Sequence, residues 1–150
     1  MMHSRCFIAA LLLFIATPSI AADLTFENVG RSTIGFVRSN GTVENANRST
    51  MGHLLANGAV ENASRSTIGF VQTNGMIENG SRSTIGFFVR RGDAIVLENS
   101  GRSTCGRVRS SGMVESAGGS TVGFIHGGVG GQERAIVGAL VFFFSLLGCP

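Results

Sequence analysis

Acidic and basic residues recur along the chain at a fixed spacing. In five places a Glu is followed four residues later by an Arg, namely Glu27/Arg31, Glu44/Arg48, Glu61/Arg65, Glu78/Arg82 and Glu98/Arg102. Such a ladder either grips an anion or a polymer, or its charges neutralise one another as solvated ion pairs. Because the ladder is balanced and has little net field, we predict that it fixes the register of repeated elements. It is broken after Glu115, where Gly119 stands in the Arg position.

The positions that vary between repeats are the candidates for ligand contact. They lie at 38–39, 72–73, 90–94 and 107–111. The fourth repeat is the longest, and it carries Arg-Gly-Asp at 91–93, the tripeptide of integrin ligands. Insertions and binding residues concentrate at turns. The predicted binding residues are therefore Arg38, Gln72, Arg90, Arg91, Asp93, Arg107 and Arg109.

No group of residues in the sequence has the pattern of a catalytic or metal centre. We find no acid pair, no nucleophile with a recurrent His nearby and no Cys-x-x-Cys spacing. We therefore expect a non-enzymatic protein with no catalytic residues, no cofactor and no metal. The formal net charge of +3 is small and evenly spread, so we expect no nucleic-acid partner.

The elements that position these residues are repeats of one unit. Ser-Thr pairs begin at 32, 49, 66, 83, 103 and 120, so the period is 17 residues with one interval of 20. A fixed period indicates a repeat architecture. The unit has an alternating arm (STIGFV), an Asn-Gly turn, a second arm (TVEN) and an Asn-x-x-Arg turn. Asn-Gly is the strongest short signal for a type I′ hairpin turn, so we predict one β-hairpin per repeat with its tip at Asn-Gly.

The two ends of the repeat array predict a closed ring. Residues 24–28 form a second arm without a first, and residues 119–125 form a first arm without a second. Pairing of these arms would leave no edge strand exposed. An open solenoid with capped ends is the alternative. We predict an all-β ring of β-hairpin repeats of about 17 residues, and the number of hairpins, five or six, stays open.

Four Phe residues share one repeat position and are predicted to be core. They are Phe36, Phe70, Phe87 and Phe124, and His53 replaces the Phe of the second repeat. The recurrent Asn after each Glu is assigned to turn chemistry, because an Asn side chain can accept hydrogen bonds from backbone amides further along the turn.

The cysteines give two alternatives. Cys105 stands where other repeats carry Ile or Met, which favours a small buried apolar residue. In an exported chain, Cys105 and Cys149 could instead form a disulfide.

Both ends of the chain differ from the repeats. Residues 1–21 have the basic, apolar and small-residue order of a signal peptide, with small residues at Ser19 and Ala21. The repeats occupy 22–126, a Gly-rich linker occupies 127–134, and an apolar segment occupies 135–150. We therefore expect an exported protein, periplasmic or extracellular, and associated with the envelope if the apolar segment contacts a membrane.

The apolar segment has three interpretations. Residues 135–148, AIVGALVFFFSLLG, carry no charge. They can pack into the core of the ring, mediate self-association or interfacial contact, or anchor the chain in a membrane. A span of the bilayer needs roughly 18–20 residues, so the length of this segment favours the core.

The repeat STIGFV…NGTVEN and the ALVFFF end resemble the five-fold β-flower family of exported bacterial proteins. In that family, repeats of the form STIGY…G-x-[IV]-x-[ND] follow a signal peptide and precede a tail rich in Ala, Val and Phe. The resemblance covers residues 24 to 147. It implies hairpins that radiate like petals, and it carries over no catalytic residue. Phe replaces the family's Tyr here, and the arms count as six pairs.

These observations predict an exported, non-enzymatic structural or binding module of the bacterial envelope, with an unidentified envelope or host-surface partner. The alternative is an adhesin at a membrane or host surface, anchored by residues 135–148 and making contact through the longest hairpin.

Overall fold

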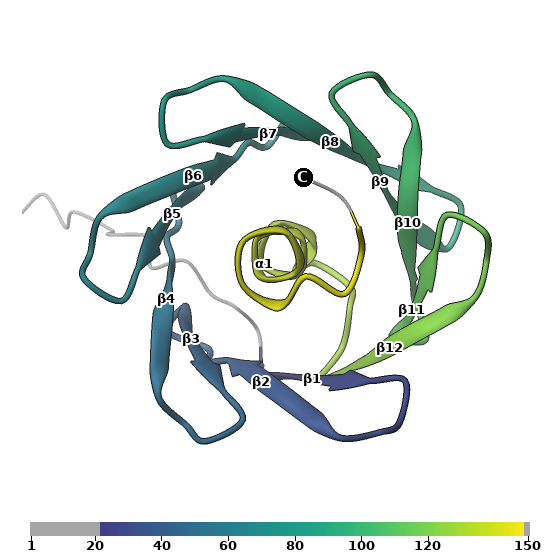
Figure 1. Cartoon of the computed structure of the whole chain (residues 1–150), viewed down its shortest axis with the longest axis horizontal. Helices are drawn as coiled ribbons and strands as arrows, with labels where there is room; N and C mark the ends of the chain where they lie inside the picture. Colours follow the sequence, from purple (N-terminus) through teal and green to yellow (C-terminus); the bar gives the residue numbers. More distant parts are fainter. Residues whose placement is uncertain (1–21, 149–150) are drawn as a thin grey trace, which may run out of the picture.

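The chain folds into a closed ring of antiparallel strands around a central helix (Figure 1). The computed structural model describes residues 22–148. Strands β1 and β12 pair from Thr25 opposite His126 to Asn28 opposite Gly123. This pairing closes the ring, so the prediction of an all-β ring with joined terminal arms is confirmed. The predicted signal peptide lies outside the described residues.

Twelve strands form the ring in the described part of the chain. Their bounds are β1 Leu24–Asn28, β2 Thr33–Val37, β3 Thr42–Asn45, β4 Thr50–Leu54, β5 Ala59–Asn62, β6 Thr67–Val71, β7 Met76–Asn79, β8 Thr84–Arg91, β9 Ala94–Asn99, β10 Thr104–Arg109, β11 Met113–Ser116 and β12 Thr121–His126. The chain then continues into helix α1, Glu133–Ala139, and a π-helical turn η1, Leu140–Phe144.

Consecutive strands form six hairpins that splay outward, which we call petals (Figure 1). The petals of residues 22–148 are the pairs β1–β2, β3–β4, β5–β6, β7–β8, β9–β10 and β11–β12. Each has a break in register close to its tip, such as the one between Val43 and Glu44. The tip is the Asn-x-x-Arg turn. The strands on either side of Asn-Gly pair antiparallel, as predicted. The prediction that Asn-Gly lies at the tip is wrong, because Asn-Gly connects one petal to the next.

The petal-to-petal connections also differ from the predicted turn type. The Gly41 amide donates to the Arg38 carbonyl at 2.8 Å, and the Arg38 amide donates to the Thr42 carbonyl at 2.8 Å. Gly41 has a φ of +86°, whereas Asn40 is not among the residues with positive φ. A type I′ turn needs positive φ at both central residues. The connection is instead a type I turn closed by a left-handed Gly. Asn40 accepts a bond from the Thr42 amide at 3.0 Å.

The petal tips have the same hydrogen bonds with Arg in the left-handed position. The Arg48 amide donates to the Asn45 carbonyl at 3.0 Å, and Arg48 has a φ of +65°. The Asn45 side chain accepts bonds from the amides of Asn47 and Ser49. The predicted turn role of the Asn residues is thus confirmed.

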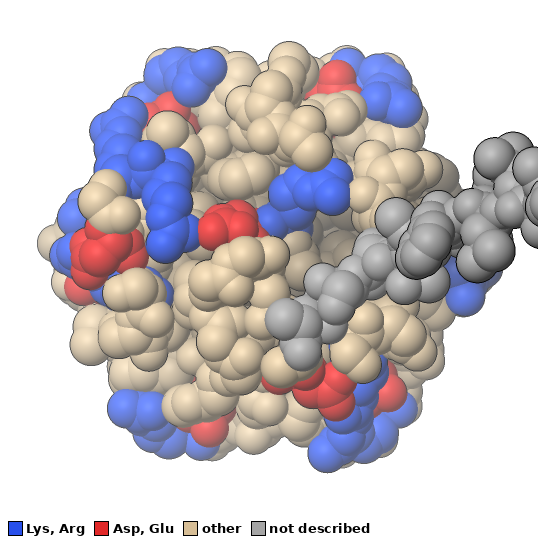
Figure 2. Space-filling model, turned by 180° about the vertical axis from the view of Figure 1, so that it is seen from behind, with Lys and Arg blue, Asp and Glu red and all other residues tan. Residues whose placement is uncertain are grey.

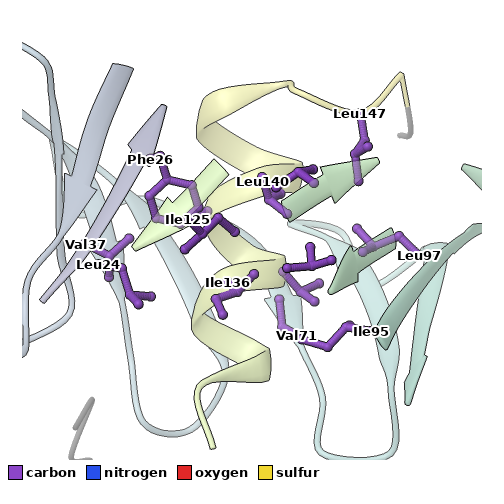
Figure 3. Close-up of a cluster of buried hydrophobic side chains, with 14 of the residues drawn as sticks. Leu24, Phe26, Val37, Val71, Ile95, Leu97, Ile125, Ile136, Leu140 and Leu147 are labelled. Atoms are coloured by element: carbon purple, nitrogen blue, oxygen red, sulfur yellow. The ribbon is translucent and has the colours of Figure 1, made fainter. Parts of the chain in front are cut away.

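The apolar C-terminal segment fills the centre of the ring (Figures 1 and 3). Ile136, Val137 and Leu140 are buried, and inward-facing side chains of the strands, such as Val37 and Val71, pack against this segment. This position fits the core interpretation of the segment. No helix among residues 22–148 has the length and apolar character needed to cross a membrane.

The Gly of the Ser-Thr-x-Gly motif makes room for the central segment in five repeats. A Cβ added to Gly35 would clash with the ring of Phe144, and the same holds for Gly52 with Phe143 and Gly69 with Phe142. Two later repeats receive smaller side chains, with Leu147 against Gly106 and Leu146 against Gly123. At each of these glycines the added Cβ would also clash with a carbonyl oxygen of the neighbouring strand. The central segment and this carbonyl together explain why these strands carry Gly at a buried position.

The repeated Phe residues lie outside this core, so their assignment to it is wrong. Phe36 alternates with Gly35 and Val37, and both of these face inward. The physical reason is that Gly, without a side chain, leaves the inner volume to the aromatic rings of the tail. Cys105 is disulfide-bonded, so the assignment to a simple buried apolar residue is also wrong. Its predicted partner, Cys149, lies outside the described residues.

Candidate binding site

The junctions between petals concentrate the charged residues of the ring. We call each junction a seam, formed by β2–β3, β4–β5, β6–β7, β8–β9, β10–β11 or β12–β1. Each seam places a nearly buried Glu opposite the Phe position, for example Glu44 opposite Phe36. The side chain of Glu98 is the most buried of these, with 3% exposed. A buried carboxylate needs hydrogen bonds and opposite charge to offset its desolvation.

At most seams two residues contact the Glu and supply opposite charge or a hydrogen bond. One is the Arg at the petal tip, such as Arg82, whose Nη1 lies 3.2 Å from Glu78. The other comes from the end of the preceding strand. Arg38 Nη2 lies 2.6 Å from Glu44, Gln72 Nε2 donates to Glu78 at 2.9 Å, and His126 Nε2 lies 3.0 Å from Glu27. The predicted ion-pair ladder is confirmed, and part of the predicted site lies within it.

The tip Arg also stacks on an aromatic ring of the preceding petal. The guanidinium carbon lies 3.3–3.9 Å from the ring centroid in Arg31/Phe124, Arg48/Phe36, Arg82/Phe70 and Arg102/Phe87. Stacking of this kind is worth about 0.5–1 kcal/mol at an exposed site. It explains why Arg, and not Gly, occupies a left-handed turn position that is unfavourable for a side chain.

The predicted tripeptide at 91–93 is tied to the chain's own charges. Arg91 lies 2.7 Å from Glu98, and Asp93 lies 3.4 Å from Arg109. Arg109 also bonds Glu115 at 3.2 Å. Arg107 Nε lies 3.6 Å from Glu115. Four predicted binding residues are therefore gathered in two neighbouring seams as ion pairs.

The remaining ion pairs involve the start of the ring and the start of the helix. Asp23 accepts bonds from the Ser39 amide and from Arg38, and these bonds hold the pKa of Asp23 below its usual value. Glu44 and Asp23 together raise the pKa of Arg38. Arg90 Nη1 lies 2.6 Å from Glu133 at the start of α1.

We call the end of the ring that carries the petal connections its turn end. This end has a hollow of about 230 Å³ that was not predicted from the sequence. It lies between two petal connections and the start of α1. Its apolar wall consists of Leu54, Leu55, Val60 and Val71, and Arg134 lies at its polar side. We call it the Leu55 hollow. Arg134 Nη2 donates to the Ala56 carbonyl at 2.9 Å.

A second hollow of about 410 Å³ adjoins the first, with Arg134 and Glu133 in both walls. Its other side is formed by Thr73, Phe88 and Arg90. Arg90 is the one predicted binding residue that lines either hollow. Figure 2 views the ring from behind and shows basic and acidic side chains mixed across that face.

Two signals in the sequence point to the Leu55 hollow in retrospect. Leu55 directly follows the alternating arm of the second repeat. At the same position four other repeats carry a polar residue, namely Arg38, Gln72, Arg109 and His126, so Leu55 is an apolar exception. Arg134 stands directly before the apolar segment. The binding residues predicted from the sequence are all charged or amide side chains, so Leu55 was not among them.

Among residues 22–148, no cluster of His, Cys, Asp and Glu could hold a metal ion. Comparison with curated proteins and with solved structures finds no match. The model of one family, described as 5-fold beta-flower protein, matches residues 23–145. The described part of this chain has six petals, whereas the description of the family gives a five-fold arrangement. Since the match spans the ring and most of its central segment, the chain belongs to the 5-fold beta-flower protein family.

Proposed function

We propose that the protein is an exported, non-enzymatic binding module of the bacterial envelope, and that it binds its partner at the turn end of the ring. The observation that carries the proposal is the pair of adjoining hollows beside Arg134. Ligand sites are concave and mostly apolar, with a few polar groups. The Leu55 hollow has this composition.

The charges of the ring support binding rather than acid–base catalysis. Every Asp and Glu of the described residues has an Arg or His within 4.0 Å. Carboxylates held in this way already have a neutralising partner within the chain. The disulfide of Cys105 supports export, because disulfides persist in oxidising compartments.

The alternative proposal, an adhesin anchored by residues 135–148, has less support. The middle of that segment is buried in the ring, where it contacts the repeated Gly residues. A segment that filled the core could enter a membrane only after leaving the ring. The Arg91 and Asp93 side chains are engaged in ion pairs within the chain, which an adhesive contact would have to break.

Fractionation tests the proposal. The full chain is expressed in a bacterial host beside a version that ends at Gly131, and membranes are washed with carbonate. We expect the full chain in the periplasmic or secreted fraction, soluble and without its first residues. We expect the shortened chain to be unfolded or degraded. Retention in the cytoplasm would contradict export, and resistance of the full chain to the wash would favour the anchored adhesin.

A further inference from the structure

We infer that the Leu55 hollow binds a short-chain aliphatic carboxylate, with the carboxylate on Arg134 and the chain against Leu55. The inference rests on the proposed binding function and names the ligand class of that site. Three observations carry it: the charge of Arg134, the apolar wall and the size of the hollow.

Among residues 22–148, Arg134 is the Arg that has no acidic partner within 4.0 Å. The other Arg residues of the described part each lie within 4.0 Å of an Asp or Glu. Arg134 has one hydrogen bond, to the Ala56 carbonyl. A guanidinium has five N–H donors in a planar fork, and a carboxylate matches that fork with two parallel bonds. Arg134 therefore has the charge and the free donors for one carboxylate.

The apolar wall comes from a break in the repeat. At the equivalent position of neighbouring seams, Arg38 and Gln72 bond the seam Glu. Leu55 cannot do this, and the seam Glu61 keeps Arg65 as its ion-pair partner at 3.3 Å. Leu55 instead joins Leu54, Val60 and Val71 in the wall of the hollow. A polar residue has thus been exchanged for an apolar one at the seam that opens beside the unpaired Arg134.

The size and the charge of the hollow indicate which anions it can bind. A volume of about 230 Å³ equals that of roughly seven to eight water molecules at about 30 Å³ each. Hexanoate, with its short chain, is of this size. One free guanidinium balances one negative charge. A dianion such as a phosphate monoester would keep a second negative charge without a counter-ion, because Arg90 is already paired with Glu133 at 2.6 Å.

Titration of the full chain, in the form the host produces, tests this inference. The probes are hexanoate, hexan-1-ol and acetate, followed by NMR of the backbone amides and by calorimetry. We expect hexanoate to saturate the protein and to shift the amides of Leu55 and Gly58. The neutral alcohol and the short acetate should each bind at least about tenfold more weakly, because each lacks one half of the interaction.

Two substitutions test the two halves of the site. Arg134→Gln removes the charge, and Leu55→Gln places at position 55 the residue that the chain itself carries at 72. Each should weaken hexanoate binding at least about tenfold. The control is Arg102→Gln, which removes an Arg from a petal tip while Glu98 keeps Arg91 at 2.7 Å. This control should bind hexanoate as the unsubstituted protein does.

The inference is overturned if hexanoate does not saturate, if hexan-1-ol binds equally well, or if either Arg134→Gln or Leu55→Gln leaves the affinity unchanged. These results are distinguishable from failure of the proposed function, which the fractionation decides independently. An exported chain without hexanoate binding would reject the ligand class alone, whereas a cytoplasmic chain would reject the envelope role.

Discussion

The guanidinium of Arg82 lies 3.4 Å from the centroid of the Phe70 ring, although Arg82 adopts a left-handed φ of +66°. The backbone conformation costs about 1 kcal/mol for a residue with a side chain. The side chain offsets this cost through the ring contact and through its ion pair with Glu78 at 3.2 Å. The tip Arg therefore joins neighbouring petals at the expense of local backbone strain.

This balance predicts different effects for two substitutions of Arg82. Arg82→Ala loses both contacts and keeps the strain, so we expect a loss of about 1 kcal/mol in the free energy of unfolding. Arg82→Gly loses the same contacts but releases the strain, and should be more stable than the Ala variant by about 1 kcal/mol. Urea unfolding measures both. Equal stability of the two variants would show that the left-handed backbone carries no strain.

The β10–β11 seam lacks the stacked pair of a tip Arg and a Phe. Arg107 stands in the Phe position opposite Glu115, and Gly119 stands in the tip position. A side chain at Gly119 would meet no atom within 4 Å. The space is open, so two other effects disfavour Arg there: Gly119 has a left-handed φ of +85°, and an Arg at this position would face the cation of Arg107.

We therefore expect Gly119→Arg to lower the free energy of unfolding by about 1 kcal/mol, from left-handed strain and like-charge repulsion. In the double variant Gly119→Arg/Arg107→Phe, the stacked pair of the other seams is restored. A double-mutant cycle should give a favourable coupling of about 1 kcal/mol. Additive effects of the two substitutions would refute the exchange of roles.

His53 takes the Phe position at the β4–β5 seam, opposite Glu61. Burial and the charge of Arg65 lower the pKa of His53 below 6.5, and Glu61 only partly opposes them. A lowered pKa means that the folded state disfavours the imidazolium. The stability contribution of neutral His53 is thus fully present above pH 6.5 and is lost as the pH falls below 6.5 through the pKa of the folded state.

The difference in unfolding free energy between the protein and its His53→Phe variant isolates this effect. Urea unfolding from pH 8 to pH 5 should show the two stabilities diverge in favour of the Phe variant as the pH decreases. Because Phe does not titrate, the other ionisable groups contribute equally to both proteins. A difference that stays constant with pH would contradict the lowered pKa.

Much of the fold could be predicted from local chemistry. The period, the alternation of the arms and the unmatched arms at 24–28 and 119–125 determine the ring and its closure. The identity of the petal tip could not be predicted, because both turns have the same hydrogen bonds. They differ in whether Gly41 or Arg48 takes the left-handed position. Asn-Gly is the stronger hairpin signal, yet here it joins petals.

The inner and outer faces of the strands could not be assigned from alternation alone. Phe36 is the larger residue and was expected inside, whereas Gly35 faces the core. The missing information was the tail, since Phe142, Phe143 and Phe144 supply the volume that the strands leave empty. The Leu55 hollow likewise depends on where the C-terminal segment lies in the ring. It exists because the start of α1 approaches the petal connections.

The fit between the tail and the repeated Gly residues gives the last prediction. A Cβ at Gly69 would clash with the Phe142 ring and lie 2.7 Å from the Glu78 carbonyl oxygen. We expect Gly69→Ala to lower the free energy of unfolding by about 1–3 kcal/mol, as overpacking of a core does. Adding Phe142→Leu should recover part of this loss, because the ring is one of the two groups in the way.

Gly130→Ala is the matched control. A Cβ there would meet nothing within 4 Å, and Gly130 has no positive φ. Its effect should lie between zero and a gain of about 0.4–1 kcal/mol, since Ala restricts the unfolded chain. Calorimetric or urea unfolding compares the three variants. Equal stability of Gly69→Ala and Gly130→Ala would contradict close packing of the segment 135–148 against the strand glycines. Other contacts would then have to hold this segment in the ring.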